Sequence, residues 1–210
     1  MKLRNLLSIF FLASAGLSQA AEPAAQLFVA MPDSLVPSIE VNRRKDLIDL
    51  FHAGQKAQVD NKLGGTTAMT LLQDNGLTVD LSQQSQMALH LYPTDRGDTL
   101  IALVNTVYGP AADSRIRFFD SFWRELPASK HMRALSTADF FAFPDSLTNT
   151  QKKEILQTTG IYLVEYTFEP DGSLCARPSW EKYLDPETFK KIEPYLRKSI
   201  TLRWNGNKLL

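Results

Sequence analysis

The chain has 210 residues, of which 44% are hydrophobic, and its 23 basic residues equal its 23 acidic residues in number. A general nucleic-acid-binding protein needs a clear basic excess, so this balance argues against that class and gives no reason to expect strong attraction to anionic lipid. The hydrophobic share can supply a well-filled core, and the single cysteine leaves no partner for an internal disulfide.

The first twenty residues have the layout of a secretory signal peptide. Lys2 and Arg4 precede an apolar run over residues 6–17, and the small residues Ser18 and Ala20 stand where cleavage after Ala20 requires them. An uncleaved membrane anchor is the alternative, but this run and every later segment fall short of the ~20 apolar residues of a membrane helix. We therefore predict a signal peptide over 1–20 and a periplasmic or secreted mature chain without a membrane span.

The mature chain begins with residues 21–37, which we predict to be a loosely tethered arm. Its charge is about −2, because cleavage removes two of the 23 basic residues. A helix is predicted next, because four apolar residues share one helical face and a glycine follows them as a typical C-terminal stop: Leu47, Ile48, Leu50, Phe51 and Gly54.

The middle of the chain has the pattern of antiparallel strands. Apolar runs flank Asp74-Asn75-Gly76, which is a strong hairpin signal. Residues 99–108 are apolar on both parities, as expected of a central strand covered on both faces. We predict a meander of about five strands, at residues 66–73, 77–82, 86–92, 99–108 and 115–123.

The last third mixes helices and strands. Thr148 and Gln151 have the spacing of a capping box, and Asp185-Pro186 the chemistry of a helix start. Strands are predicted at residues 161–168, near 174–178 and at 199–204. The fold class predicted is α+β, as a single domain over residues 21–210, with a weak internal duplication around 31–35 and 143–147 as an alternative.

Several segments resemble an uncharacterised family of exported proteins from anaerobic Gram-negative bacteria of the Bacteroidales type. The segments are RRKDLIDLF, NKLGG, DNGLTVDLSQQSQMALHLYP and RIRFFDSFW, and the likeness covers most of the mature chain from about Val36 onward. The resemblance implies a periplasmic or secreted location. It carries no activity and no catalytic residues.

Complete catalytic, phosphate-binding or metal-binding motifs are absent from the sequence. The potential soft ligands are His52, His90, His131 and Cys175, which stand on four different predicted elements without ligand spacing, so neither a metal nor a cofactor is predicted. We interpret His90 as a strand residue on the solvent face and Cys175 as a small, half-buried strand residue without an activating base.

Paired carboxylates are the remaining candidate catalytic groups. Asp95 and Asp98 share a hairpin turn with Arg96, and Glu165 interrupts an apolar strand. Paired carboxylates could hydrolyse a glycoside, but Asp in a turn with Gly is ordinary turn chemistry, so no catalytic residue is assigned.

The stretch RIRFFDSFW, residues 115–123, is the candidate binding surface. As a strand it turns one face to the core, with Ile116, Phe118 and Phe122. The other face combines aromatic rings with guanidinium groups, a chemistry suited to sugars, peptides and carboxylates, and carries Arg115, Arg117, Phe119 and Trp123. The alternative is that this face is also core, with arginine stems covering its rim.

These observations favour an exported, non-enzymatic binding module for an envelope protein or glycan. The alternatives are an envelope hydrolase with paired carboxylates and a carrier with an apolar pocket for a small ligand.

Overall fold

The computed structural model describes residues 22–210, so the predicted signal peptide over 1–20 lies outside the described residues. The predicted α+β class is confirmed. The described chain contains one sheet of seven antiparallel strands, in the order β1 to β7, and a second antiparallel sheet in the order β10-β9-β8.

The α-helices are α1 (Pro23–Ala30), α2 (Val41–His52), α3 (Ala128–His131), α4 (Asn149–Thr158) and α5 (Pro186–Ile192). The large sheet contains β1 (Gln58–Asp60), β2 (Thr66–Gln73), β3 (Gly76–Ser82), β4 (Ser85–Pro93), β5 (Thr99–Tyr108), β6 (Ala112–Phe119) and β7 (Glu125–Leu126). The small sheet contains β8 (Val164–Phe168), β9 (Leu174–Pro178) and β10 (Ile200–Leu202). Short 3-10 turns lie at η1 (Asp33–Leu35), η2 (Thr137–Phe140), η3 (Trp180–Lys182) and η4 (Glu193–Tyr195).

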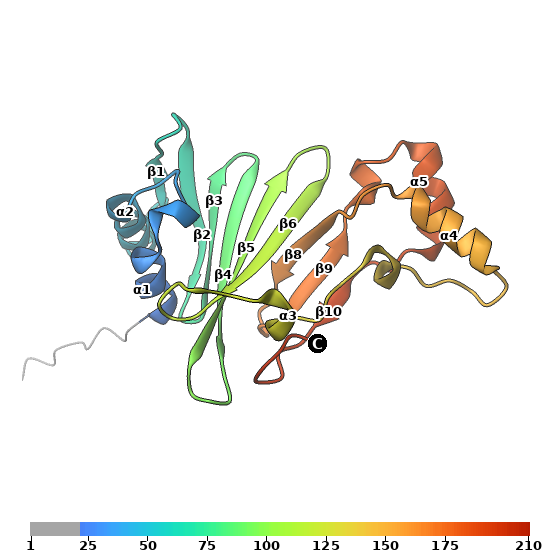
Figure 1. Cartoon of the computed structure of the whole chain (residues 1–210). Helices are drawn as coiled ribbons and strands as arrows, with labels where there is room; N and C mark the ends of the chain where they lie inside the picture. Colours follow the sequence, from blue (N-terminus) through green and yellow to red (C-terminus); the bar gives the residue numbers. More distant parts are fainter. Residues whose placement is uncertain (1–21) are drawn as a thin grey trace, which may run out of the picture.

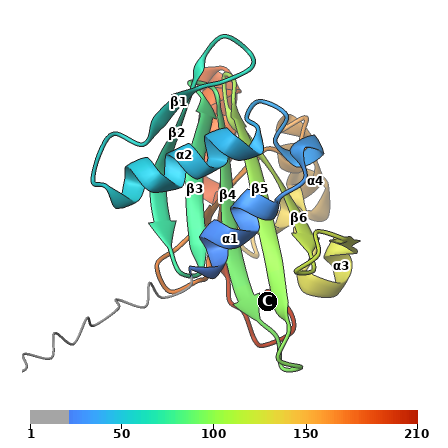
Figure 2. The ribbon, with the colours of Figure 1, turned by 90° about the vertical axis from the view of Figure 1, so that its left-hand side faces the viewer.

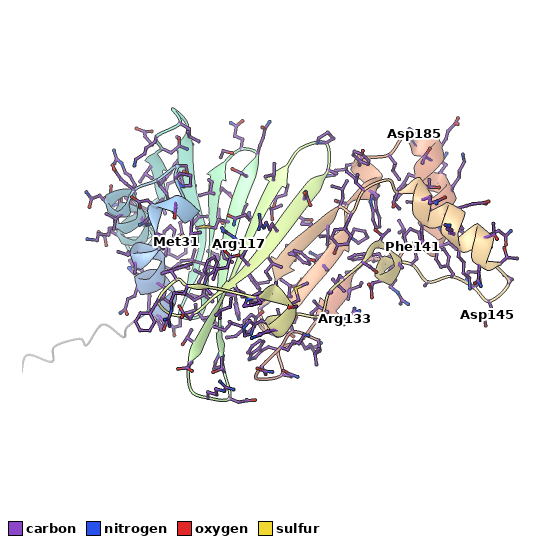
Figure 3. All side chains as sticks on the ribbon, in the orientation of Figure 1. Met31, Arg117, Arg133, Phe141, Asp145 and Asp185 are labelled. Carbon is purple, nitrogen blue, oxygen red and sulfur yellow. The ribbon has the colours of Figure 1, made fainter. Side chains whose placement is uncertain are left out.

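The elements form successive layers. Helices α1 and α2 cover one face of the large sheet, the small sheet lies on its other side, and α4 and α5 lie beyond it (Figures 1 and 2). In Figure 3, Met31 on the α1 side and Asp145 and Asp185 at the opposite end mark the length of this arrangement. Two hydrophobic clusters result, one on each face of the large sheet.

Strand β5 separates these two clusters, as its composition predicts. Ile101 and Leu103 belong to the cluster beneath the helices, whereas Leu100, Ala102 and Val104 belong to the cluster shared with the small sheet. The five predicted strands of the meander are all present. The strands β1 and β7 were missed because they have only three and two residues, too few to show an alternation of polarity.

The prediction of a loosely tethered arm over 21–37 is wrong, because this segment forms α1 and η1 and packs into the core. Ala24 and Phe28 are fully buried, and Val36 is buried beside them. An eight-residue helix is marginal alone in water, so its stability comes from this packing rather than from its own sequence.

A buried arginine fastens the same segment to α2. Arg44 is only 2% exposed, and its guanidinium donates to three carbonyl oxygens and to a carboxylate: Ile39 O at 3.3 Å, Val29 O at 3.2 Å, Met31 O at 2.8 Å and Asp33 Oδ1 at 2.9 Å. A buried charge is tolerated only when it is well hydrogen-bonded. Arg44 is therefore a structural residue.

The predicted helix boundaries are confirmed by the cap geometry. Thr148 and Gln151 form both bonds of a capping box at α4, and Asp185 accepts a hydrogen bond from the Thr188 amide at α5. Each of the two similar segments, 31–35 and 143–147, precedes a helix, but the sheets that follow have seven and three strands. The internal duplication stays a prediction. Within residues 22–210, no helix is both long and apolar enough to cross a bilayer.

Candidate functional site

The aromatic rings of the predicted binding surface lie in the core. Phe119 is 2% exposed and Trp123 is 8% exposed, and both belong to the cluster beneath α1 and α2. Their rings contact each other with centroids 5.4 Å apart. A partner can therefore reach neither ring without moving the N-terminal helices.

The two arginines of this set lie at the surface. Arg115 is exposed, and Arg117, half-buried, holds its guanidinium 5.3 Å from the centroid of Phe119 and 3.9 Å from Glu125. Figure 3 shows Arg117 on the large sheet near Met31, on the side of the N-terminal helices. These two side chains are the part of the predicted set that remains accessible from solvent.

The assignment of Phe122 to the core is wrong, since its side chain is 78% exposed. The strand ends at Phe119, and the Asp120 carboxylate then accepts hydrogen bonds from the amides of Phe122 at 2.9 Å and Arg124 at 3.0 Å. Trp123 adopts a φ of 61°, so the turn directs its indole inward while Phe122 points outward. The alternation of a strand could not predict this outcome, because the strand stops within the stretch.

The carboxylates considered for hydrolysis lie at the tip of the β4–β5 hairpin. Asp95 and Asp98 are both exposed, and the hairpin is closed by hydrogen bonds between Thr94 and Asp98. Asp95 also packs against the segment that follows β10, where its amide donates to Gly206 O at 3.1 Å. Asp95 and Asp98 are therefore placed as residues that stabilise the hairpin turn.

The interpretation of His90 as a solvent-facing residue is wrong. Its face of β4 also carries Ala88 and Tyr92, and the small sheet covers that face. His90 is 8% exposed, with its ring stacked on Phe168 at 5.2 Å and tilted against Tyr92 at 4.6 Å. Burial lowers the pKa of His90 to about 4, so the imidazole is neutral at neutral pH.

Two glycines make room for this imidazole. A Cβ at Gly172, in the β8–β9 turn, would lie 3.0 Å from His90 Nε2, and one at Gly76 would lie 3.3 Å from His90 Nδ1. Gly172 also has a φ of 78°, which only glycine adopts readily. The absence of side chains at these two positions thus leaves space beside both ring nitrogens.

Neither ring nitrogen of His90 has a hydrogen-bond partner among residues 22–210, yet neither is among the fully buried side-chain atoms that lack one. The nitrogens of this neutral imidazole, one donor and one acceptor, therefore remain reachable from solvent. His90 borders a depression of about 340 Å³, which we name the Trp204 depression. The groups in its wall that matter here are Asn75, His90, Tyr92, Asp171, Arg203 and Trp204.

The aromatic part of the Trp204 depression is held rigidly. The rings of Tyr92 and Trp204 stack with centroids 4.8 Å apart. Trp204 Nε1 donates to Pro93 O at 2.8 Å, and the Tyr92 hydroxyl donates to Gly172 O at 2.7 Å. Burial raises the pKa of Tyr92, so this hydroxyl keeps its proton. Both aromatic polar atoms are occupied, which leaves the rings as apolar surface.

The charged part of the depression is an exposed ion pair. Arg203 Nη1 lies 3.0 Å from Asp171 Oδ2, while Asp171 Oδ1 accepts from the Ser173 hydroxyl at 2.6 Å and amide at 2.9 Å. Hydrogen bonds from Ser173, and then from Arg203, hold the pKa of Asp171 below its usual range, so the carboxylate is ionised at neutral pH. The pair brings a fixed acceptor and additional guanidinium donors to the rim.

A wider groove of about 530 Å³ lies between α2 and β1 and is lined by Asp46, Asp49 and Asp60 together with Arg43. Arg43 pairs with Asp46 at 3.3 Å, and both side chains are about half exposed. The Trp204 depression is the better candidate site, because it brings stacked rings, an ion pair and an imidazole without a protein partner among residues 22–210 to one place.

The remaining soft ligands are dispersed. His52, at the C-terminus of α2, lies 2.8 Å from Glu22, and His131 ends α3. Cys175 lies on β9, as predicted, but it is buried rather than half-buried. Across residues 22–210, no three His, Cys, Asp or Glu side chains come together as metal ligands would.

Sequence reasoning missed this site because its parts come from β4, the β8–β9 turn and the segment after β10. Only the placement of the small sheet brings Asp171 and Trp204 to Tyr92. One signal was available: His90 lies on the same strand face as Ala88 and Tyr92, and this face is too apolar for a solvent face.

A solved structure has the same fold. It is described as a domain of an uncharacterized protein from Porphyromonas gingivalis W83, and it matches with a TM-score of 0.78 and 22% sequence identity, over 90% of this chain and 98% of that one. At this identity the likeness shows the fold alone. No curated protein matches the chain.

A family model matches residues 16–209, almost the whole chain. Its description is "Protein of unknown function (DUF3256)". The resemblance to an uncharacterised family is thereby confirmed, while export and bacterial origin stay predictions. The chain belongs to this family of proteins of unknown function.

Proposed function

We propose that the protein is an exported, non-enzymatic binding protein of the cell envelope and that its partner is a glycan. The observation that carries the proposal is the Trp204 depression, where a neutral buried imidazole without a partner, an ion pair and two stacked rings meet. A concave site that combines apolar rings with a few convergent polar groups is the usual form of a ligand site.

The chemistry of the depression favours a glycan over a protein partner. Sugar hydroxyls both donate and accept hydrogen bonds, which suits a neutral imidazole, a carboxylate and a guanidinium side by side. The C–H face of a sugar ring can pack on an aromatic surface such as Trp204. A protein hot spot would instead offer an exposed apolar anchor or a pocket for one, and the depression has a polar rim.

Export is supported by the leader-like sequence of residues 1–20. We expect the protein in the periplasmic or secreted fraction, with Ala21 as its first residue. Cell fractionation followed by mass spectrometry of the N-terminal peptide tests this expectation. Recovery of an intact Met1 terminus in the cytoplasmic fraction would contradict it.

The glycan proposal is tested by retention of the purified mature protein on immobilised envelope polysaccharide. We expect wild-type protein to be retained and Trp204→Ala to be lost in the flow-through. Tyr183→Ala is the matched control, because Tyr183 is an aromatic residue 46% exposed that does not line the depression. Retention that survives Trp204→Ala, or that disappears when the envelope preparation is treated with protease, would contradict the proposal.

A further inference from the structure

We propose that the Trp204 depression is a subsite for one uncharged pyranose residue, whose hydroxyl groups pair with His90, Asp171 and Arg203 and whose ring packs on Trp204. This inference rests on the proposed glycan-binding function and specifies the chemical class of the ligand.

The volume of the depression limits the ligand to about one sugar ring. Sites for small molecules span roughly 300–1,000 Å³, and the depression, at about 340 Å³, lies at the lower end of that range. A longer glycan would place one residue in the depression and continue into solvent, because the site is open to the surface.

His90 selects for an uncharged group. The imidazole is neutral, lies between Gly76 and Gly172, and is 8% exposed. An anionic ligand group would find no cation there, and a cationic group no anion. A hydroxyl can donate to or accept from either ring nitrogen at no cost in charge burial.

The charges around the rim disfavour an acidic sugar. Arg203 is already paired with Asp171, so the two together carry no net charge. Among the side chains that line the depression, Arg203 is the only cation. A sugar carboxylate would therefore find no unpaired cation in the wall.

The aromatic surface is ready for a ligand before binding. Trp204 is fixed by its hydrogen bond to Pro93 O and by its stacking on Tyr92. Little side-chain entropy is then lost on binding, which is the general advantage of a preorganised site.

The test is an NMR titration of the mature protein with a neutral disaccharide panel of cellobiose, maltose and diacetylchitobiose, and with digalacturonic acid as the acidic counterpart. We expect at least one neutral disaccharide to shift the Trp204 indole resonance saturably and the acidic one to bind about tenfold more weakly or not at all. His90→Leu, Asp171→Asn and Arg203→Gln should each weaken neutral binding about tenfold, the worth of one well-placed hydrogen bond.

Arg177→Gln is the matched control for Arg203→Gln, because Arg177 also pairs with an acidic residue on the small sheet but does not line the depression. A thermal melt of each variant shows that it is folded; if His90→Leu does not fold, Asp171→Asn and Arg203→Gln carry the same test.

The outcomes separate the two proposals. Tighter binding of digalacturonic acid, or sugar binding that leaves the Trp204 resonance unmoved, overturns the uncharged-pyranose subsite and leaves glycan binding standing. Absence of binding by every sugar on the panel overturns the subsite, and failure of retention on envelope polysaccharide overturns the function itself.

Discussion

Each face of the large sheet buries one large polar side chain, and the two side chains differ in the number of their protein partners. Beneath the N-terminal helices, the buried guanidinium of Arg44 has partners in three carbonyl groups and one carboxylate. Beneath the small sheet, the buried imidazole of His90 has none among the described residues and borders the Trp204 depression. A buried guanidinium held by four protein acceptors serves the fold, whereas an imidazole that has no protein partner among residues 22–210 and borders a depression is open to a ligand.

The largest expected effect is on the helix-covered face. Phe119→Ala removes a fully packed ring and should lower the free energy of unfolding by about 3–5 kcal/mol, measured by chemical denaturation. Phe122→Ala, three residues along the same stretch, should change it by no more than about 0.5 kcal/mol because that ring is 78% exposed. Equal effects of the two substitutions would contradict the placement of these rings.

Arg44→Met tests the member of the comparison that has several protein partners. It leaves the carbonyls of Val29 and Met31 without their donor, so we expect a loss of about 3 kcal/mol in the free energy of unfolding. The neighbouring Arg43 pairs only with Asp46 at an exposed position. Arg43→Met should therefore cost less than about 1 kcal/mol in the same denaturation experiment.

The pH dependence of stability tests the burial of His90. Its folded pKa, about 4, lies below the ordinary value of 6.5, so between these values the unfolded state binds more protons. Stability should fall by up to about 3 kcal/mol as pH decreases from about 6.5 to about 4. His90→Leu should remove this part of the slope. An identical pH profile for His90→Leu and wild type would show that His90 is solvated.

The smallest expected effect is the difference in stability cost between two glycine substitutions. It distinguishes the cost of a positive φ from the cost of a clash with the imidazole. Gly172→Ala and Gly97→Ala both place alanine at a positive φ, of 78° and 82°, but only the first brings a Cβ within 3.0 Å of His90. We expect a loss of about 1 kcal/mol for Gly97→Ala and about 2 kcal/mol for Gly172→Ala in denaturation. Only Gly172→Ala should also weaken ligand binding. Similar losses in the free energy of unfolding for both variants would mean that the His90 ring can move away from the added Cβ at little cost.

The sequence predicted most of the large sheet because local patterns specify it. The hairpin around Asp74 and Asn75, the two apolar parities of β5 and the caps at Thr148 and Asp185 are all readable within a few residues. Helix α1 was not readable, because its stability comes from burial against residues far along the chain.

The candidate site was the least predictable part. Aromatic density around Phe119 drew attention to a stretch that fills the core, as hydrophobic residues usually do. The depression depends on contacts between segments more than a hundred residues apart, such as Trp204 with Pro93. The periodicity or residue spacing within one segment cannot predict which distant segments come into contact.

The most direct test of ligand binding at His90 is the ¹⁵N NMR signal of its imidazole during titration with a neutral disaccharide. We predict that the ring-nitrogen signals of His90 move saturably and with the same dissociation constant as the Trp204 indole signal, because a sugar hydroxyl forms a hydrogen bond with the imidazole. Ring-nitrogen signals that stay fixed while the protein saturates with sugar would contradict the assignment of this site.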